Sequence, residues 1–416
     1  MTKARDLATL AGSATGLATD SELSAAIAGI DLTNVQRIVP VDSNISVPGA
    51  PTSVSGTVLN ASSAVSFVAP TDNGGSTILS YTVISSPGNI KKSGSSSPIT
   101  ITGLTNGTAY TFTVKAHNIA GSSNASTASS SVTPAPVFSV DYLVVAGGGG
   151  GGSYAGGGGG AGGLRSTVTA TGGGGTLETP LILAKGTNYT ATVGAGGAGG
   201  LESTNSRGTN GANSVFSTIT SIGGGGGGSR ATTSGLDGGS GGGCSATGTF
   251  GARTVNQGFA GGSGTVASGR FGAGGGGGAG ATGSDGNSSD SGAGGNGVAV
   301  SITGSSVTYA GGGAGGDQGS NDGTKSGGTG GGGSSPGAGD GNPGTANTGG
   351  GGGGGSAFND TFTKNGGAGG SGVVILRYLT ADATITIGAG LTGSTATSGS
   401  YTVATLTAGT GNVSWA

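Results

Sequence analysis

Four aspartates in the second half of the chain are the residues whose spacing comes nearest to a catalytic pair. Two carboxyl groups about 5–9.5 Å apart can act as acid and base in the hydrolysis of a glycosidic bond. One of them must then keep its proton, which requires apolar surroundings that raise its pKa. Each aspartate lies among glycine, serine and asparagine, so we expect no enzyme activity. The four are Asp285, Asp290, Asp317 and Asp322.

The other reactive side chains occur singly. His117, the only histidine, has no cysteine or carboxylate cluster beside it that would make a metal site. Cys244 is the only cysteine, so no disulfide forms within the chain, and we expect a small apolar filler there. Strings of the GxGxxG type arise by chance in so glycine-rich a chain, and the alternating helices of a dinucleotide fold are missing. No cofactor and no metal are therefore expected.

Binding is better supported than catalysis, because recognition is concentrated on loops that a rigid scaffold holds. Three loops between glycine tracts, at residues 201–210, 229–271 and 356–365, contain most of the arginine and phenylalanine of their region. Aromatic rings can stack on sugars, and arginine forks bind acidic groups. For any one phenylalanine, filling a gap between glycines is the alternative. The candidate receptor-binding residues are Arg207, Arg230, Phe250, Arg253, Phe259, Arg270 and Phe271.

The composition excludes several classes of partner. Only 8% of the 416 residues are charged, and the net charge is -2. Binding to nucleic acid requires a basic stripe that neutralises phosphates, and none is present. No apolar run is long enough to span a bilayer, and the first residues lack the apolar stretch of a secretory signal.

Residues 1–40 are predicted to contain one short helix. Thr19 and Glu22 have the spacing of a capping box, and Leu23, Ile27 and Ile30 then form an apolar stripe. A helix this short is marginal alone because nucleation is costly. We expect an attachment or oligomerisation element, with a trimer favoured; a frayed leader is the alternative.

Residues 47–134 are predicted to form a β-sandwich. Runs rich in valine, isoleucine, threonine and tyrosine alternate with turn residues every eight to twelve positions. The segment resembles a fibronectin type III domain, with Pro51 at its entry and residues 118–121 before its last strand. In such a domain the second strand usually carries a tryptophan, and Phe67 stands near that place. The structural residues of the resemblance are Phe67, Tyr81, Leu104, Gly107 and Tyr110, the last as a tyrosine corner.

Residues 138–380 are dominated by glycine. Of the 105 glycines, 87 lie between positions 147 and 372, about 38% of that span, against about 7% on average. Apolar runs at 140–146 and 372–378 are predicted to pair and to join the start of the domain to its end. Glycine disfavours the α-helix but permits threefold extended helices that pack side by side. Flexible linkers are the alternative for tracts such as 349–355. Shorter strand units that also feed glycine tracts are predicted at 189–193, 211–220 and 295–309.

This glycine-rich segment resembles the glycine-rich domains of bacteriophage tail fibres and tail-tip adhesins, in which polyglycine II helices are stacked. The predicted fold is all-β: a fibronectin III-like sandwich, a body of short strands and packed polyglycine II helices, and a C-terminal β segment at 381–416. Trp415 in that segment is expected to pack, with a role as an anchor for a partner as the alternative.

The resemblance implies a virion protein that is assembled in the host cytoplasm and exposed on the particle. Its expected partners are other virion proteins and a host surface glycan or protein. A head fibre or decoration protein, and a bacterial surface or filament protein, remain as alternatives.

Overall fold

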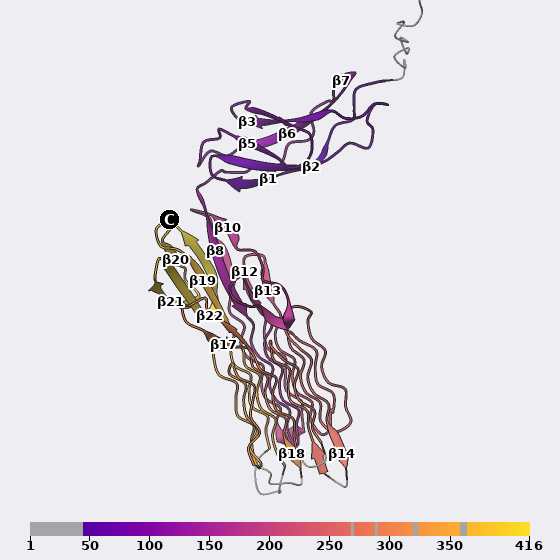
Figure 1. Ribbon diagram of the computed structural model, residues 1–416, viewed down its shortest axis with the longest axis vertical. Helices are drawn as coiled ribbons and strands as arrows, with labels where there is room; N and C mark the ends of the chain where they lie inside the picture. Colours follow the sequence, from indigo (N-terminus) through magenta and orange to yellow (C-terminus); the bar gives the residue numbers. More distant parts are fainter. Residues whose placement is uncertain (1–44, 268–269, 288–289, 319–322, 358–363) are drawn as a thin grey trace, which may run out of the picture.

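The computed structural model consists of β-strands and extended glycine segments, which confirms the all-β class. Figure 1 shows a small β-sandwich and a long body that has a sheet at its near end and continues as a bundle of extended segments. The helix predicted within residues 1–40 lies outside the described residues. The structure describes residues 45–267, 270–287, 290–318, 323–357 and 364–416.

The sandwich consists of two antiparallel sheets around one core. Successive residues of a strand point to opposite faces, and β6 alternates between buried and part-buried positions over its whole length for this reason. One sheet has the order β1-β2-β5 and the other the order β4-β3-β6-β7. The strands are β1 (Thr52–Leu59), β2 (Ser62–Val68), β3 (Ser80–Ser86), β4 (Lys91–Gly94), β5 (Ile99–Thr102), β6 (Thr111–Asn118) and β7 (Gly121–Ser122).

The five structural residues named from the sequence lie in or beside this core. Phe67 and Tyr81 are buried, with their ring centroids 4.8 Å apart. Leu104 is buried, and Gly107 has a φ of 81°, a left-handed conformation that favours glycine. The Tyr110 hydroxyl accepts a hydrogen bond of 3.1 Å from a backbone N–H five residues earlier, which is the geometry of a tyrosine corner.

Beyond β7, the sequence predicts a last strand, and the structure has a serine ladder in its place. Ser123, Ser126 and Ser129 each donate their backbone N–H to a carbonyl of β6, and their Oγ atoms accept the β6 N–H groups. Every third residue of the serine segment thus pairs with every second residue of β6. This is possible because each serine Oγ accepts the N–H bond that a backbone carbonyl would accept in a regular sheet. The β6 partners are Ala116, Val114 and Phe112, respectively.

Replacing Ser126 with alanine is expected to destabilise the sandwich by about 1–3 kcal/mol, because the buried N–H of Val114 loses its acceptor at 2.9 Å. Urea unfolding followed by hydrogen exchange of peptides from β6 measures this change. Ser130, which is exposed, provides the control, and its alanine variant should unfold with the wild type. Equal stability of all three proteins would contradict the role of the ladder.

The body begins in a sheet that joins both ends of the domain. β8 pairs with β19, as predicted, and β22 pairs with β19 along one half and with β11 along the other. The C-terminal segment therefore belongs to this sheet, whose order is β10-β8-β19-β22-β11-β12-β13. Its strands are β8 (Val137–Val145), β9 (Leu164–Ser166), β10 (Leu181–Ala184), β11 (Tyr189–Thr192), β12 (Ser214–Phe216), β13 (Ile219–Ser221), β19 (Val373–Leu379), β20 (Ile385–Ile387), β21 (Leu391–Ser398) and β22 (Tyr401–Trp415).

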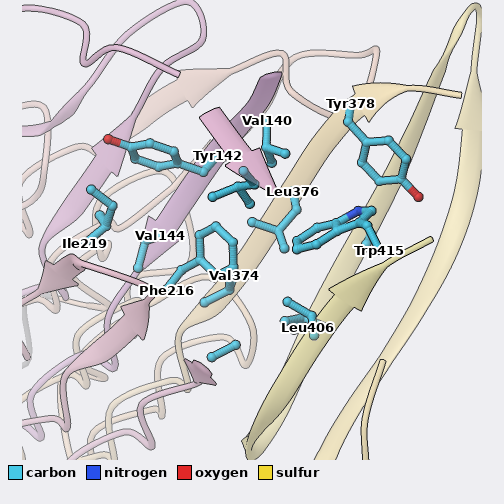
Figure 2. Packing of buried hydrophobic residues seen from close by; sticks show 14 of the residues in the cluster. Val140, Tyr142, Val144, Phe216, Ile219, Val374, Leu376, Tyr378, Leu406 and Trp415 are labelled. Atoms are coloured by element: carbon cyan, nitrogen blue, oxygen red, sulfur yellow. The ribbon is translucent and has the colours of Figure 1, made fainter. Parts of the chain in front are cut away.

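Both faces are buried over residues 142–145 of β8 and 373–376 of β19, which explains why these stretches are continuous apolar runs. On one face, Tyr142, Leu376 and Trp415 belong to a large cluster (Figure 2). On the other face, Leu143 and Ile375 belong to a second cluster that includes residues of the hairpin β16 (Val298–Val300) and β17 (Val307–Tyr309).

The glycine tract 147–152 is hydrogen-bonded to six surrounding segments. N–H groups three residues apart donate to one neighbour, and carbonyls three residues apart accept from another. Gly148 and Gly151, for example, donate to Gly370 and Gly367, each at 2.9 Å. Three donor directions and three acceptor directions are what a threefold extended helix produces, so the predicted packing of polyglycine II helices is confirmed. The donors reach segments 157–160, 209–212 and 367–370, and the carbonyls accept from 197–200, 224–227 and 352–355.

At most glycine positions in the interior of the bundle no side chain fits. A Cβ atom added to Gly148 would lie 2.1 Å from the Gly350 oxygen, whereas a close carbon–oxygen contact is about 3.3 Å. Ala195 and Ala198, three residues apart on one tract, are both exposed, whereas Ala161 and Ala314 are buried at positions that have room for a methyl group. The period of three therefore accounts for the exposed alanines of the tract 194–200.

The far end of the body carries short strands and turns (Figure 1). A small sheet with the order β14-β15-β18 lies there. Its strands are β14 (Thr265–Ala267), β15 (Arg270–Gly272) and β18 (Asp317–Gln318); the two 3-10 turns of the body are Gly172–Gly174 and Glu202–Thr204.

Candidate binding sites on the glycine-rich body

The ends and flanks of the body are the only described places where it presents large side chains, because its interior consists of backbone. Four of the seven candidate residues have close contacts with another ring or cation, in two separate clusters. One cluster, the far-end cluster, contains Arg230 and Phe271. The other, the flank cluster, contains Phe250, Arg253 and Phe259 around one hollow.

In the far-end cluster, the guanidinium of Arg230 lies between two rings. Its Cζ atom is 4.7 Å from the ring centroid of Phe271 and 5.2 Å from that of Tyr154. Its Nη1 atom also donates to the Gln318 side chain at 2.9 Å. The stack therefore joins a glycine turn, a loop and the small terminal sheet, and such cation–π contacts are stabilising.

Lys364 extends this cluster beneath the surface. Its side chain is 3% exposed and forms an ion pair with Glu202 at 3.0 Å. The ammonium also lies 5.1 Å from the Tyr154 ring centroid. Desolvating a lysine is costly unless a carboxylate accompanies it, so Glu202 and Lys364 fix their two loops to each other.

The flank cluster surrounds an open hollow of about 410 Å³. The Arg253 guanidinium lies 5.2 Å from the ring centroid of Phe259, and Phe250 is 48% exposed. Ala252, Ala260 and Thr282 complete the lining. Flat rings beside a cation can hold a ligand that has both an apolar face and a negative charge.

Arg207 and Arg270 are exposed, and the contacts of the described residues bring neither into the two stacks. Sequence reasoning did not name Tyr154, Lys364 or Glu202. The one available signal was the tyrosine of residues 153–155, which interrupt a run of glycines.

The described aspartates that were considered for catalysis contact different groups. The Asp285 carboxylate accepts the Ser263 N–H at 2.7 Å, and Asp290 forms an ion pair with Lys325. Asp317 is buried in β18, while Asp322 lies outside the described residues. These contacts provide no acid–base pair among the described aspartates.

The remaining reactive groups are held by the fold. The two ring nitrogens of His117 each lie 2.8 Å from a hydroxyl, of Thr82 and Ser122. Cys244 is buried, which raises the pKa of its thiol, and its Sγ accepts a backbone N–H at 2.9 Å. No cluster of metal-ligating residues occurs in the described ranges.

A polar trio that the sequence did not predict lies beside β8, with Tyr142 buried and Arg165 and Glu178 partly buried. Glu178 accepts two hydrogen bonds from Arg165, at 2.7 and 2.6 Å, and one from the Tyr142 hydroxyl at 2.5 Å. Burial, followed by the bond to Glu178, raises the pKa of Tyr142 well above its usual range. The bidentate ion pair fixes the segment around Glu178 to β9, which is a structural role.

Comparisons with known proteins agree with this geometry. A family model described as "Glycine-rich domain" matches residues 122–379, or 258 of the 416 residues. The chain belongs to the glycine-rich domain family. In this member of the glycine-rich domain family, a fibronectin type III domain precedes the body, as the match to residues 49–132 shows. No curated protein matches the chain.

Some solved structures are similar to about a fifth of this glycine-rich family member. Titin domains A168–A170 are 26% identical over 21% of this chain and 32% of that one, with a TM-score of 0.20. The twitchin kinase region from C. elegans is 25% identical over 21% and 17%, also with a TM-score of 0.20. The chain thus spans a third or less of these proteins. In the described ranges, no helix is both long and apolar enough to cross a bilayer.

Proposed function

We propose that the protein is a structural adhesion protein of a bacteriophage virion, a tail fibre or receptor-binding adhesin that presents loops to a host surface glycan or protein. The glycine bundle supports this proposal, because backbone hydrogen bonds repeated every three residues hold it together without side chains. Such a bundle can keep distant loops in fixed positions, and recognition is typical of loops on a rigid scaffold.

The far-end cluster is the observation that carries the proposal. Tyr154, Arg230 and Phe271 come from three segments separated by long glycine tracts, yet their side chains are stacked together. Phe271 belongs to β15, which lies between β14 and β18 in the small sheet at the end of the body away from its main sheet (Figure 1). Aromatic residues and arginine are enriched in the parts of interfaces that contribute most binding energy. Arg230 and Phe271 were both candidate receptor-binding residues.

The other parts of the chain have supporting roles in this proposal. The fibronectin type III domain acts as a spacer, and residues 1–40, which lie outside the described residues, attach the protein to other virion proteins and form a homo-oligomer, with a trimer favoured. The protein is then exposed on the virion surface after assembly in the host cytoplasm.

Competition for adsorption tests the proposal. Purified full-length protein is expected to bind saturably to host cells and to reduce the adsorption of the virions that contain it. Presence in virions without either effect would contradict an adhesin and favour a head fibre or decoration protein. Presence on bacterial cells and absence from virions would favour a bacterial surface or filament protein.

Truncating the far-end cluster should weaken this binding. Arg230→Ala and Phe271→Ala are each expected to raise the dissociation constant for host cells about thirtyfold, the effect of losing about 2 kcal/mol at an interface hot spot. Lys92→Ala removes an exposed positive charge from the sandwich and serves as the matched control. Fluorescence of Trp415 verifies that each variant is folded. Wild-type affinity in both far-end variants would contradict the assignment of this face.

A further inference from the structure

The flank hollow is built by three neighbouring segments of the bundle. Phe250 and Arg253 are three residues apart on the first segment, so a threefold extended backbone places them on one outward face. The second segment, which carries Phe259, is joined to the first by a hydrogen bond from Gly261 to Gly251 at 3.2 Å. The third contributes Thr282, which precedes a hydrogen bond from Gly283 to Ala260.

The hollow is lined by the exposed ring of Phe250 and by the partly buried ring of Phe259. Ala252 and Ala260 are small, so the space between Phe250 and Phe259 is not filled by the protein itself. Its volume of about 410 Å³ lies within the range of about 300–1,000 Å³ that is usual for ligand sites. Phe250 is 48% exposed, so a ligand in the hollow can reach its ring.

The cation at the rim has no anionic partner in the described part of the chain. Arg253 stacks on Phe259 but forms no ion pair there. The Asp237 carboxylate instead accepts the backbone N–H of Ala252 at 2.6 Å. A guanidinium presents its donors as a fork that matches a carboxylate.

From these observations we infer that the flank hollow binds a carboxylate-bearing sugar residue of an acidic glycan. The apolar face of the sugar ring lies on Phe250, and the carboxylate accepts hydrogen bonds from Arg253. An open hollow beside the exposed ring of Phe250 suits a flat sugar face better than a peptide side chain, which requires a deeper apolar pocket. The biological setting of this site rests on the proposed function, because it adds the class of glycan to the presenting role.

Titration of the full-length protein with short oligosaccharides tests the inference. The probes are a tetramer of galacturonic acid, a tetramer of sialic acid and, as the neutral match, a tetramer of galactose. At least one acidic tetramer is expected to bind at least about tenfold more tightly than the neutral one, and its affinity should fall with added salt. Equal affinity for acidic and neutral sugars, or binding of neither acidic tetramer, would overturn the inference.

Variants assign the binding to the hollow. Arg253→Ala and Phe250→Ala are each expected to weaken binding of the acidic tetramer at least about tenfold. Arg253→Lys keeps the charge but loses the fork of donors, so its affinity should lie between those of the wild type and Arg253→Ala. Lys92→Ala is the control, since Lys92 is an exposed cation on the sandwich, away from the hollow. An equal loss in the Lys92 variant would indicate general attraction of anions and would contradict the site.

The two proposals can fail separately. Oligosaccharide binding that depends on Arg253, without any competition for virion adsorption, would support the flank site and contradict the adhesin function. Adsorption that depends on Arg230 and is unchanged in Arg253→Ala, together with no oligosaccharide binding, would do the reverse. Binding of an apolar peptide with a free carboxylate in preference to both acidic sugars would also overturn the inference.

Discussion

Replacing Gly151 with valine is expected to prevent the glycine-rich body from folding, with a loss of at least about 4 kcal/mol in the free energy of unfolding. A Cβ at this position would lie 2.1 Å from the Gly353 oxygen. The neighbour is backbone that is itself hydrogen-bonded on several sides, so no side chain can rotate away to relieve the clash. The protein's only tryptophan, Trp415, lies in the sheet of the body, and its fluorescence during urea unfolding measures the change.

Ala198→Val is the control for this variant. Ala198 lies on a segment that packs against the same central tract, but its side chain is exposed. The added methyl groups then enter solvent, and the expected change is within about 0.5 kcal/mol. Unfolding of the Gly151 variant at the wild-type urea concentration would show that the tract is not packed in the bundle interior.

The sequence contained enough information to predict the strands and the kind of glycine helix. The apolar runs that became β8 and β19 were predicted to pair because they are continuous apolar runs at the two ends of one domain. Which glycine tracts lie next to each other could not be predicted from the sequence. Gly147–Gly152 and Gly349–Gly355 have no side chains that would distinguish them, so the choice of neighbours depends on turns and on the end sheet.

The spacing of residues other than glycine carried more information than their number. In Gly194–Gly200 an alanine stands at every third position, and both alanines are exposed. A pure glycine tract such as 147–152 has no permitted outward position and lies at the centre. The same period explains why a serine ladder stands in place of the predicted last strand of the sandwich, since Ser123, Ser126 and Ser129 follow a repeat of three and not the repeat of two expected for a strand.

The candidate sites were predictable by residue type but not by arrangement. Arginine and phenylalanine in loops indicated binding, and the structure places Phe250 with Arg253 and Phe259 around one hollow. Tyr154 could not be assigned to the far-end cluster, because its contact with Arg230 spans more than seventy residues of chain. Contacts of this kind depend on how the glycine tracts run back and forth.

Truncating Trp415 to alanine is expected to destabilise the body by about 3–5 kcal/mol. The side chain is 1% exposed, and its ring lies 5.5 Å from that of Phe138 and 5.9 Å from that of Tyr189, measured between centroids. Phe216 and Tyr378 complete a cage of four rings, at 6.4 and 6.1 Å. The indole, which belongs to the last strand β22, thus packs against residues from the beginning and from the end of the body's sequence (Figure 2).

Hydrogen exchange of peptides from β8 and β19 in urea measures this loss, and peptides from β3 and β6 give an internal reference because the sandwich has its own core. Trp415→Phe keeps a ring in the cage and should lose less stability than the alanine variant, while Thr397→Ala on the exposed strand β21 should lose almost none. If Trp415→Ala keeps wild-type protection in β8 and β19 but loses binding to other virion proteins, the indole anchors a partner instead. Loss of protection confined to the body would show that the C-terminal strand completes the platform from which the glycine helices extend.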